Sequence, residues 1–332
     1  MRLLALIGFS LLAPLLPASA QSFDCASAGS EFEHLICDTP ELSRLDGRLD
    51  IAYRTAIAAL SPEALAAVRT GQRQWLAHAQ TVCLGPLASS YNEPPACLAT
   101  EYRNRLTALG QSRMAGEHRF YTVSAYASGP DPNYADQPDS VWALAAHKAD
   151  AVRIDDDDPM ARILNAETDR LLEHSEARKA DGFDTGADTQ LSMRIESVSQ
   201  RRISLRIDGW WYGHGAAHGN YATTYVHVLS EPARLIGTDD IFDTEGWQTA
   251  LAEATLESLR ATLGDILWEV EVDDLVDIVA DPARWIFAER GLTIQFQPYE
   301  VTAYAYGAPT TTVSWDSLED FTTEDAYTLS WE

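Results

Sequence analysis

Residues 190–208 read QLSMRIESVSQRRISLRID, a stretch in which apolar and polar side chains alternate. Successive side chains of a strand point to opposite faces of a sheet, so this alternation predicts two half-buried strands, residues 190–197 and 201–208. Further strands are predicted at residues 121–126, 222–229, 292–296 and 311–315, and helices at 160–179 and 247–263. Because strands and helices are mixed without a regular strand–helix–strand order, an α+β domain with an antiparallel sheet is favoured.

Before these strands, residues 23–112 show apolar side chains at helical spacing. Thr39-Pro40-Glu41 and Ser61-Pro62-Glu63 are typical helix starts, with a capping hydroxyl, a proline in the first turn and an acid near the positive end. A third helix is predicted to end at Gly110. The sequence therefore predicts a multidomain chain, with a small all-α domain at residues 21–112 and the α+β domain at residues 113–332.

Residues 1–20 have the form of a signal peptide, with Arg2, an apolar run and a final Ala-Ser-Ala. Gln21 follows the predicted cleavage point, and the apolar run is too short for a stable membrane span. We therefore expect a soluble periplasmic or secreted protein of the cell envelope, with no membrane span. Residues 127–140, ASGPDPNYADQPDS, are rich in Pro, Asp, Ser and Gly and are predicted to form a loop.

In an exported protein an even number of cysteines favours disulfides over a metal site. All four cysteines belong to the helical domain: Cys25, Cys37, Cys83 and Cys97. The pairs Cys25–Cys37 and Cys83–Cys97 are favoured, because each closes a short loop next to a helix end. Antiparallel helices that bring Cys37 near Cys83 are the alternative.

The chain carries 50 acidic and 24 basic residues, a net charge of −26. Residues 21–112 hold 10 acidic and 7 basic residues, whereas residues 113–332 hold 40 and 16. Nucleic acids and anionic membranes need a basic surface, so neither is expected as a partner. A cationic partner would be attracted; the alternative is that the charge only keeps an exported protein soluble.

His214 and His218 lie four residues apart in GHGAAHGN, residues 213–220, and His227 is the nearest further histidine. Three glycines in this segment favour a turn over a zinc-binding helix, and no Glu stands between the histidines as in the metalloprotease signature. We therefore predict structural histidines, with no metal and no other cofactor.

Two groups of carboxylates are candidates for contact with a partner: Asp155, Asp156, Asp157 and Asp158, then Asp273, Asp274 and Asp277. The first group lacks the glycine and the spacing of a calcium loop. A carboxylate pair could serve glycoside hydrolysis, but 50 acidic residues offer many such pairs. Because a serine nucleophile motif and a phosphate-binding glycine loop are also missing, we predict that the protein is not an enzyme.

The first part of the chain resembles the N-terminal family of the lysozyme inhibitor LprI, over residues of about 23–109. The segments that carry this resemblance are Phe23-Asp24-Cys25, Glu33-His34-Leu35-Ile36-Cys37, Pro40-Glu41-Leu42, Gln72-Arg73-Gln74-Trp75-Leu76, Cys83, Cys97-Leu98 and Tyr102-Arg103-Asn104-Arg105-Leu106. The resemblance implies an exported helical module with a lysozyme partner.

Residues of about 120–325 resemble the domain of unknown function at the C-terminus of the anti-sigma factor RsiV. The segments that carry it are Tyr212-Gly213, Gly215-Ala216-Ala217-His218-Gly219-Asn220, Asp240-Ile241-Phe242, Gly291-Leu292-Thr293-Ile294, Phe296-Gln297-Pro298-Tyr299-Glu300 and Tyr304-Ala305-Tyr306-Gly307. This resemblance also implies a lysozyme partner, and lysozymes are typically strongly cationic.

Our first hypothesis is therefore an exported lysozyme-binding protein that inhibits by occlusion and electrostatic capture. The second is a structural or sensory protein of the cell envelope without inhibitor activity, which binds peptidoglycan through Trp210, Trp211 and Tyr212. On a strand these aromatics would alternate in facing, so one or two of them are expected in the core. The third is a hydrolase with a close carboxylate pair in a cleft.

Overall fold

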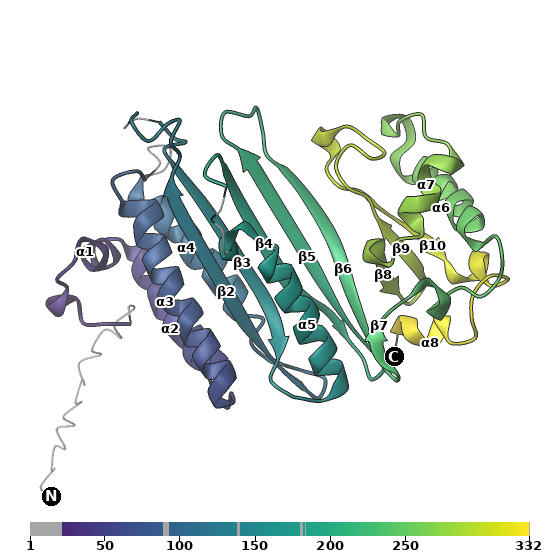
Figure 1. Ribbon diagram of the computed structural model, residues 1–332, viewed down its shortest axis with the longest axis horizontal. Helices are drawn as coiled ribbons and strands as arrows, with labels where there is room; N and C mark the ends of the chain where they lie inside the picture. Colours follow the sequence, from purple (N-terminus) through teal and green to yellow (C-terminus); the bar gives the residue numbers. More distant parts are fainter. Residues whose placement is uncertain (1–21, 89–92, 138–139, 180–181, 183, 332) are drawn as a thin grey trace, which may run out of the picture.

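The structure is a computed structural model that describes residues 22–331, except for residues 89–92, 138–139, 180–181 and 183. The predicted signal peptide, residues 1–20, lies outside the described residues. Figure 1 shows a group of helices, a long sheet, and a second group of helices with a smaller sheet, in that order along the longest axis. Within the described ranges, no helix has the length and apolar character needed to cross a membrane.

The helical region contains α1 (Glu31–Asp38), α2 (Pro40–Ala56), α3 (Pro62–Leu84) and α4 (Pro94–Leu109). α2 and α3 begin at the predicted prolines, and the hydroxyl of Ser61 accepts a hydrogen bond from the Ala64 amide. The expectation of three helices was wrong, because it omitted the short helix α1. A capping box of Ser30 and Glu33 starts that helix and compensates for its small length.

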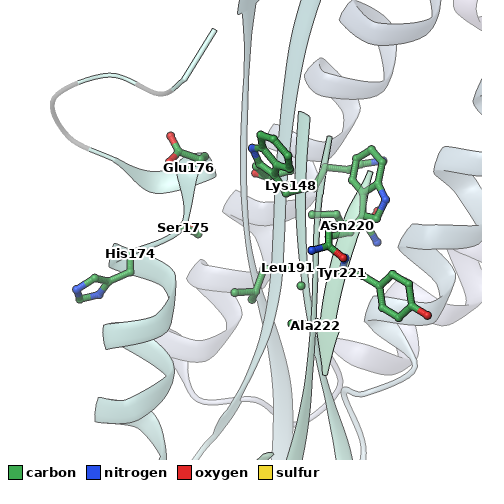
Figure 2. Close-up of a pocket in the computed structure, with 13 residues that line it drawn as sticks. Lys148, His174, Ser175, Glu176, Leu191, Asn220, Tyr221 and Ala222 are labelled. Atoms are coloured by element: carbon green, nitrogen blue, oxygen red, sulfur yellow. The ribbon is translucent and has the colours of Figure 1, made fainter. Parts of the chain in front are cut away.

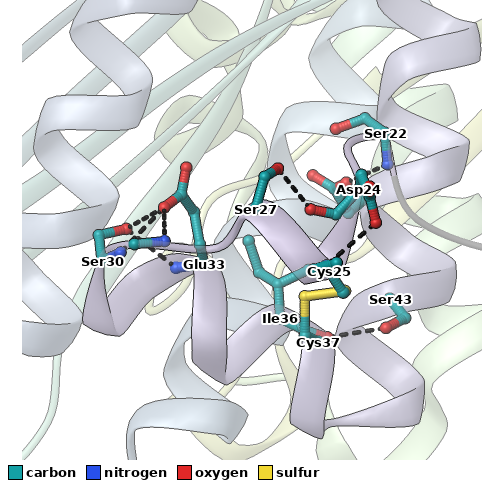
Figure 3. Close-up of a disulfide and its surroundings, with 12 residues drawn as sticks. Ser22, Asp24, Cys25, Ser27, Ser30, Glu33, Ile36, Cys37 and Ser43 are labelled. Atoms are coloured by element: carbon teal, nitrogen blue, oxygen red, sulfur yellow. Dashed lines mark hydrogen bonds between the residues drawn. A yellow bond between two sulfur atoms is a disulfide. The ribbon is translucent and has the colours of Figure 1, made fainter.

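Disulfides join Cys25 to Cys37 and Cys83 to Cys97, the pairs that the sequence favours. Figure 3 shows the first, which connects the short turn of Cys25–Ser27 to the end of α1. Nearby, the Ser43 hydroxyl of α2 donates a hydrogen bond of 2.7 Å to the Ile36 carbonyl. Each such bridge typically contributes about 2–4 kcal/mol, which helps to hold a small helical core together.

The large sheet has seven strands in the order of the chain: β1 (Met114–Ala115), β2 (His118–Pro130), β3 (Leu144–Ile154), β4 (Ala187–Val198), β5 (Arg202–Gly213), β6 (Asn220–Ser230) and β7 (Ala233–Leu235). All neighbours pair antiparallel except β3 and β4, which are parallel. The predicted α+β class with a largely antiparallel sheet is confirmed. The parallel pair needs a crossover, and α5 (Pro159–Glu173) supplies it.

The alternation in residues 190–208 places apolar and polar side chains on opposite faces of the sheet. Ile203, Leu205 and Ile207 on β5 are buried in one core with Met160 and Leu164 of α5. α5 therefore covers this face of the central strands.

The structure differs from the sequence-based prediction most clearly at two boundaries and at one strand. β2 continues to Pro130, so the first part of the predicted loop at residues 127–140 is strand; residues 138–139 lie outside the described residues. α5 ends at Glu173 and not at residue 179, and β3 was not predicted at all. β3 is rich in alanine, which carries little strand signal.

The C-terminal unit contains α6 (Trp247–Leu263), α7 (Val272–Val279), α8 (Ala326–Trp331) and a three-stranded sheet of β8 (Trp285–Ala288), β9 (Gly291–Gln295) and β10 (Thr310–Ser314). α6 has the predicted bounds. Its core is separate from that of the large sheet and includes the stacked rings of Phe242 and Trp247, 4.3 Å apart, with Trp285 close by.

Two junctions connect the large sheet to its neighbours. At the helical junction α3 lies on β2, where a Cβ at Gly71 would come within 3.2 Å of the Ser124 side chain, so glycine permits the close approach. At the C-terminal junction β6 packs against the segment that leads into β8, and the His227 ring donates a hydrogen bond of 3.0 Å to the Trp285 carbonyl.

Candidate functional site

An acidic groove of about 740 Å³ lies where the start of α3 meets the turn between β3 and α5. Its walls come from the helical region on one side and from the large sheet with α5 on the other. Its charged side chains are the carboxylates of Glu63, Asp155, Asp156, Asp157 and Asp169 and the guanidinium groups of Arg153 and Arg162. Carboxylates are therefore in excess, and the groove suits a cationic group.

Two of the predicted aspartates support the walls of this groove. Asp155 accepts hydrogen bonds from the Ser61 amide at 2.7 Å and from the Ser61 hydroxyl at 2.6 Å, so it fixes the first turn of α3. Asp158 caps α5, because it accepts a hydrogen bond of 2.9 Å from the Ala161 amide. Caps of this kind contribute about 0.5–2 kcal/mol to stability.

The other two aspartates of this run face solvent. Asp156 bends the turn by accepting hydrogen bonds from the amides of Asp157, at 2.7 Å, and Asp158, at 3.2 Å. The Arg162 guanidinium donates to the carbonyl of Asp157 and so leaves the carboxylate of that residue for another partner. Both aspartates are exposed, as is Glu63 across the groove. These three carboxylates can therefore be reached by a bound protein.

The second predicted group lies on α7. Asp273, Asp274 and Asp277 are exposed, whereas Leu275 and Val279 on the same helix are buried. Asp274 also accepts a hydrogen bond of 2.9 Å from the Glu271 amide and so caps the helix. Figure 1 places α7 in the C-terminal unit, away from the β3–α5 turn. The structure therefore does not bring the two predicted groups together.

The glycine-rich segment places its two histidines in different surroundings. His214 Nδ1 donates a hydrogen bond of 2.7 Å to Asp131, and Asp188 lies 3.4 Å from its other ring nitrogen. His218 stacks on Tyr304, with ring centres 4.3 Å apart. Among the described residues, no group of three His, Cys, Asp or Glu side chains is placed to hold a metal ion.

Ser204 and His227 form a hydrogen-bonded pair on neighbouring strands. The His227 ring donates to the Trp285 carbonyl, so its other nitrogen accepts from the Ser204 hydroxyl at 2.7 Å. This resembles a nucleophile with its base. However, the exposed fractions are 1% for Ser204 and 3% for His227, and burial lowers the pKa of His227 to about 3. We interpret the pair as a structural contact of the C-terminal junction.

Trp210 and Trp211 are both on the surface, with exposed fractions of 41% and 49%. The expectation that one or two of the three aromatics lie in the core is therefore wrong for both tryptophans, although Tyr212 is half-buried. The Trp210 ring stacks on Tyr212 at 6.1 Å. Trp211 lines a separate groove, shown in Figure 2, between strands β4 to β6 and the turn after α5.

Sequence reasoning missed Glu63 and Asp169 as members of the acidic groove. Glu63 was interpreted only as a favourable acid at the start of a helix, and Asp169 was one acid among many. The only available signal was the position of Ser61-Pro62-Glu63 at a helix start, since the contact between Ser61 and Asp155 spans 94 positions in the chain.

The helical region and the C-terminal unit each match a different family model. Residues 24–114 match the family model described as Lysozyme inhibitor LprI, and residues 239–316 match the one described as Protein of unknown function (DUF3298). The two resemblances drawn from the sequence are thereby confirmed for these regions. The chain thus combines an LprI-like helical region with a DUF3298-like C-terminal unit, and neither description names an enzymatic activity.

Curated relatives of the first region are Lipoprotein LprI of Mycobacterium tuberculosis and of Mycobacterium bovis. Each is 30% identical over 93 residues, which is 28% of this chain and 43% of the relative. The chain therefore spans less than half the length of the curated relatives that it matches.

Two solved structures of the DUF3298 family are similar to this chain over roughly two thirds of its length. The one from Bacteroides fragilis is 14% identical, covers 66% of this chain and 98% of its own, and has a TM-score of 0.50. The one from Pseudomonas aeruginosa is also 14% identical, covers 62% and 95%, and has a TM-score of 0.43. The first similarity is evidence for the fold only.

Proposed function

We propose that this protein is exported and binds a lysozyme, which it inhibits by electrostatic capture and by occlusion of the substrate cleft. The observation that carries the proposal is the acidic groove, because α3 of the LprI-matched residues and the large sheet build it together. In this proposal the helical domain, residues 21–112, and the larger domain, residues 113–332, act as one binding unit.

The charge distribution supports a cationic partner. Residues 113–332 carry 40 acidic and 16 basic residues, whereas residues 21–112 are nearly balanced at 10 and 7. Opposite charges of this kind can raise association rates by about 10–10³-fold at low salt. We propose that Asp273, Asp274 and Asp277 on α7 take part in this long-range attraction.

The direct contacts of the proposal are Glu63, Asp156 and Asp157, whose carboxylates are exposed around the groove. Asp155 and Asp158 hold the two walls in place through Ser61 and Ala161. A lysine or arginine at about 4 Å from one of the exposed carboxylates gains about 4 kcal/mol of Coulomb energy before desolvation, at an effective dielectric constant of about 20. Several such contacts around one groove would hold a cationic surface in a defined orientation.

The test is lysis of bacterial cell walls by a c-type lysozyme in the presence of the mature protein, with calorimetry at two salt concentrations. We expect slower lysis in an excess of this protein, and binding that weakens markedly when the ionic strength rises from about 0.05 to about 0.5 M. Unchanged lysis at a large molar excess would end the proposal.

A pair of matched variants tests the position of the site. D156N/D157N and D273N/D277N each remove two negative charges from exposed positions, so they change the net charge equally. We expect the first to weaken lysozyme binding about tenfold, and the second to slow association with less than about a threefold loss of affinity. Equal losses from the two variants would show that only the net charge matters and that the groove is not the contact.

A further inference from the structure

The sheet face covered by α5 is open at one end. α5 ends at Glu173, and the chain leaves this face through residues 174–176, close to the tip of the β5–β6 hairpin. A groove of about 410 Å³ lies at this open end. Figure 2 shows the residues that line it. None of the described lining residues of this groove also lines the acidic groove.

The aromatic residues Trp210, Trp211 and Tyr221 line this groove, and glycine shapes the position of Trp211. Gly213 lies two residues further along β5, on the same face, and a Cβ there would come within 2.9 Å of Cη2 of Trp211. The indole therefore extends along the strand over a position that only glycine leaves free. Its exposed fraction of 49% shows that no part of the protein covers the ring completely.

Next to the indole, a row of cross-strand neighbours forms a low apolar floor. Leu191, Gly209 and Ala222 are paired across β4, β5 and β6. A Cβ added to Gly209 would meet only the Ala222 carbonyl, at 4.0 Å, so the space above the floor is open.

Polar groups surround this floor without adding a free positive charge. Asn220 is paired with Trp211 across β5 and β6, and Glu176 lies on the opposite side. Lys148, the only lysine or arginine among the lining residues, donates a hydrogen bond of 2.7 Å to Glu101 of α4. Among the described lining residues, an anionic ligand would therefore find no available lysine or arginine, in a chain of net charge −26.

We propose that this groove binds a neutral glycan, with one pyranose ring stacked on Trp211. A pyranose has an apolar face of C–H groups, which can pack on the Trp211 indole and the apolar floor. It also has a rim of hydroxyls, which can form hydrogen bonds with the Asn220 amide and the Glu176 carboxylate. The site goes beyond the proposed lysozyme binding. It uses other residues, so either proposal can fail without the other.

The test is titration of the mature protein, without lysozyme, with tri-N-acetylchitotriose and with cellotriose, followed by calorimetry and tryptophan fluorescence. We expect a Kd on the order of 1 mM for at least one of the two sugars. Binding of the first sugar alone would assign the site to N-acetylated glycans, and binding of both would assign it to neutral glycans in general.

Three variants locate the binding. W211A removes the stacking ring, and G209L fills the floor without a clash at its Cβ; each should weaken binding at least about fivefold. W268A is the matched control, because Trp268 is also an exposed tryptophan, at 44%, but does not line this groove, and the change should alter the Kd by less than about twofold. Trp211 is half exposed, so its loss should leave the fold intact by circular dichroism. Absence of binding by either sugar at about 10 mM, or binding that survives both W211A and G209L, would overturn the proposal.

Discussion

The large sheet meets its neighbours at two junctions, and each junction buries one arginine. At the helical junction, Arg105 donates to Ser124 at 2.7 Å and to Gln72 at 2.9 Å, and lies 3.5 Å from the Asp150 carboxylate. At the C-terminal junction, Arg202 donates to the Leu329 carbonyl at 2.9 Å and lies 4.5 Å from the centre of the Phe287 ring. Of the residues described, none brings a carboxylate into an ion pair with Arg202.

Each junction also buries one histidine. His227 has a hydrogen-bond partner on both ring nitrogens, Ser204 and the Trp285 carbonyl. His78, on α3, packs against the Tyr126 ring at 5.1 Å, and within the described residues neither of its nitrogens has a hydrogen-bond partner. Burial lowers the pKa of both rings to about 3. The comparison teaches that burial, together with a nearby cation, keeps a ring neutral with or without hydrogen bonds, whereas the contribution of the ring to stability depends on its hydrogen bonds.

The largest loss of stability is expected from Arg105→Met. It leaves the Asp150 carboxylate in the junction without its cation, and breaking a buried pair in this way costs about 3–5 kcal/mol. Arg202→Met should cost less, about 1–2 kcal/mol, because burial already disfavours that cation and lowers its pKa to about 10. Urea unfolding of both variants at pH 7 measures the difference. Equal losses would show that the carboxylate partner is not what distinguishes the junctions.

The helical junction also shows what the sequence could predict. Helix starts at Pro40 and Pro62 and the alternation of β5 were predictable, because their signals are local. The contact of Arg105 with Ser124 and Asp150 joins three elements of the chain, and no local pattern contains it. β3 was missed because it is rich in alanine, which has little strand preference.

The same reasoning applies to the two grooves. The acidic run at residues 155–158 was visible in the sequence, but its division into two wall residues and two exposed residues depends on Ser61 and on the start of α5. The exposure of Trp211 depends on the end of α5 at Glu173, which the sequence placed six residues too late.

The second prediction concerns both histidines together. The unfolded chain takes up protons on these rings below a pH of about 6.5, whereas the folded chain, with a pKa of about 3 at both, does not. Stability is therefore full above pH 6.5 and falls with the pH, by about 2–4 kcal/mol between pH 7 and pH 5. Urea midpoints across this range measure it, and a flat profile would contradict the buried neutral state. Burial also lowers the pKa of His147, so this residue too makes the protein less stable as the pH falls.

A smaller effect is expected from His227→Phe at the C-terminal junction. The new ring keeps the apolar volume but leaves the Ser204 hydroxyl and the Trp285 carbonyl without the imidazole, so we expect a loss of about 2 kcal/mol at pH 7. Thermal and urea unfolding at pH 7 measure this change. A stability equal to that of the parent chain would show that these two hydrogen bonds add nothing to the junction.

The smallest effect at pH 7 is expected from His78→Phe, the matching change at the helical junction. This ring makes no hydrogen bond to the described residues, so its replacement removes only a polar group that burial disfavours, and the free energy of unfolding should change by less than about 1 kcal/mol. The acid dependence should change more clearly. One histidine fewer lowers the slope of stability against pH by up to about 1.4 kcal/mol per pH unit below pH 6.5. A loss at pH 7 as large as that of His227→Phe, with an unchanged acid slope, would mean that His78 has a partner in solution and that the two junctions hold their histidines alike.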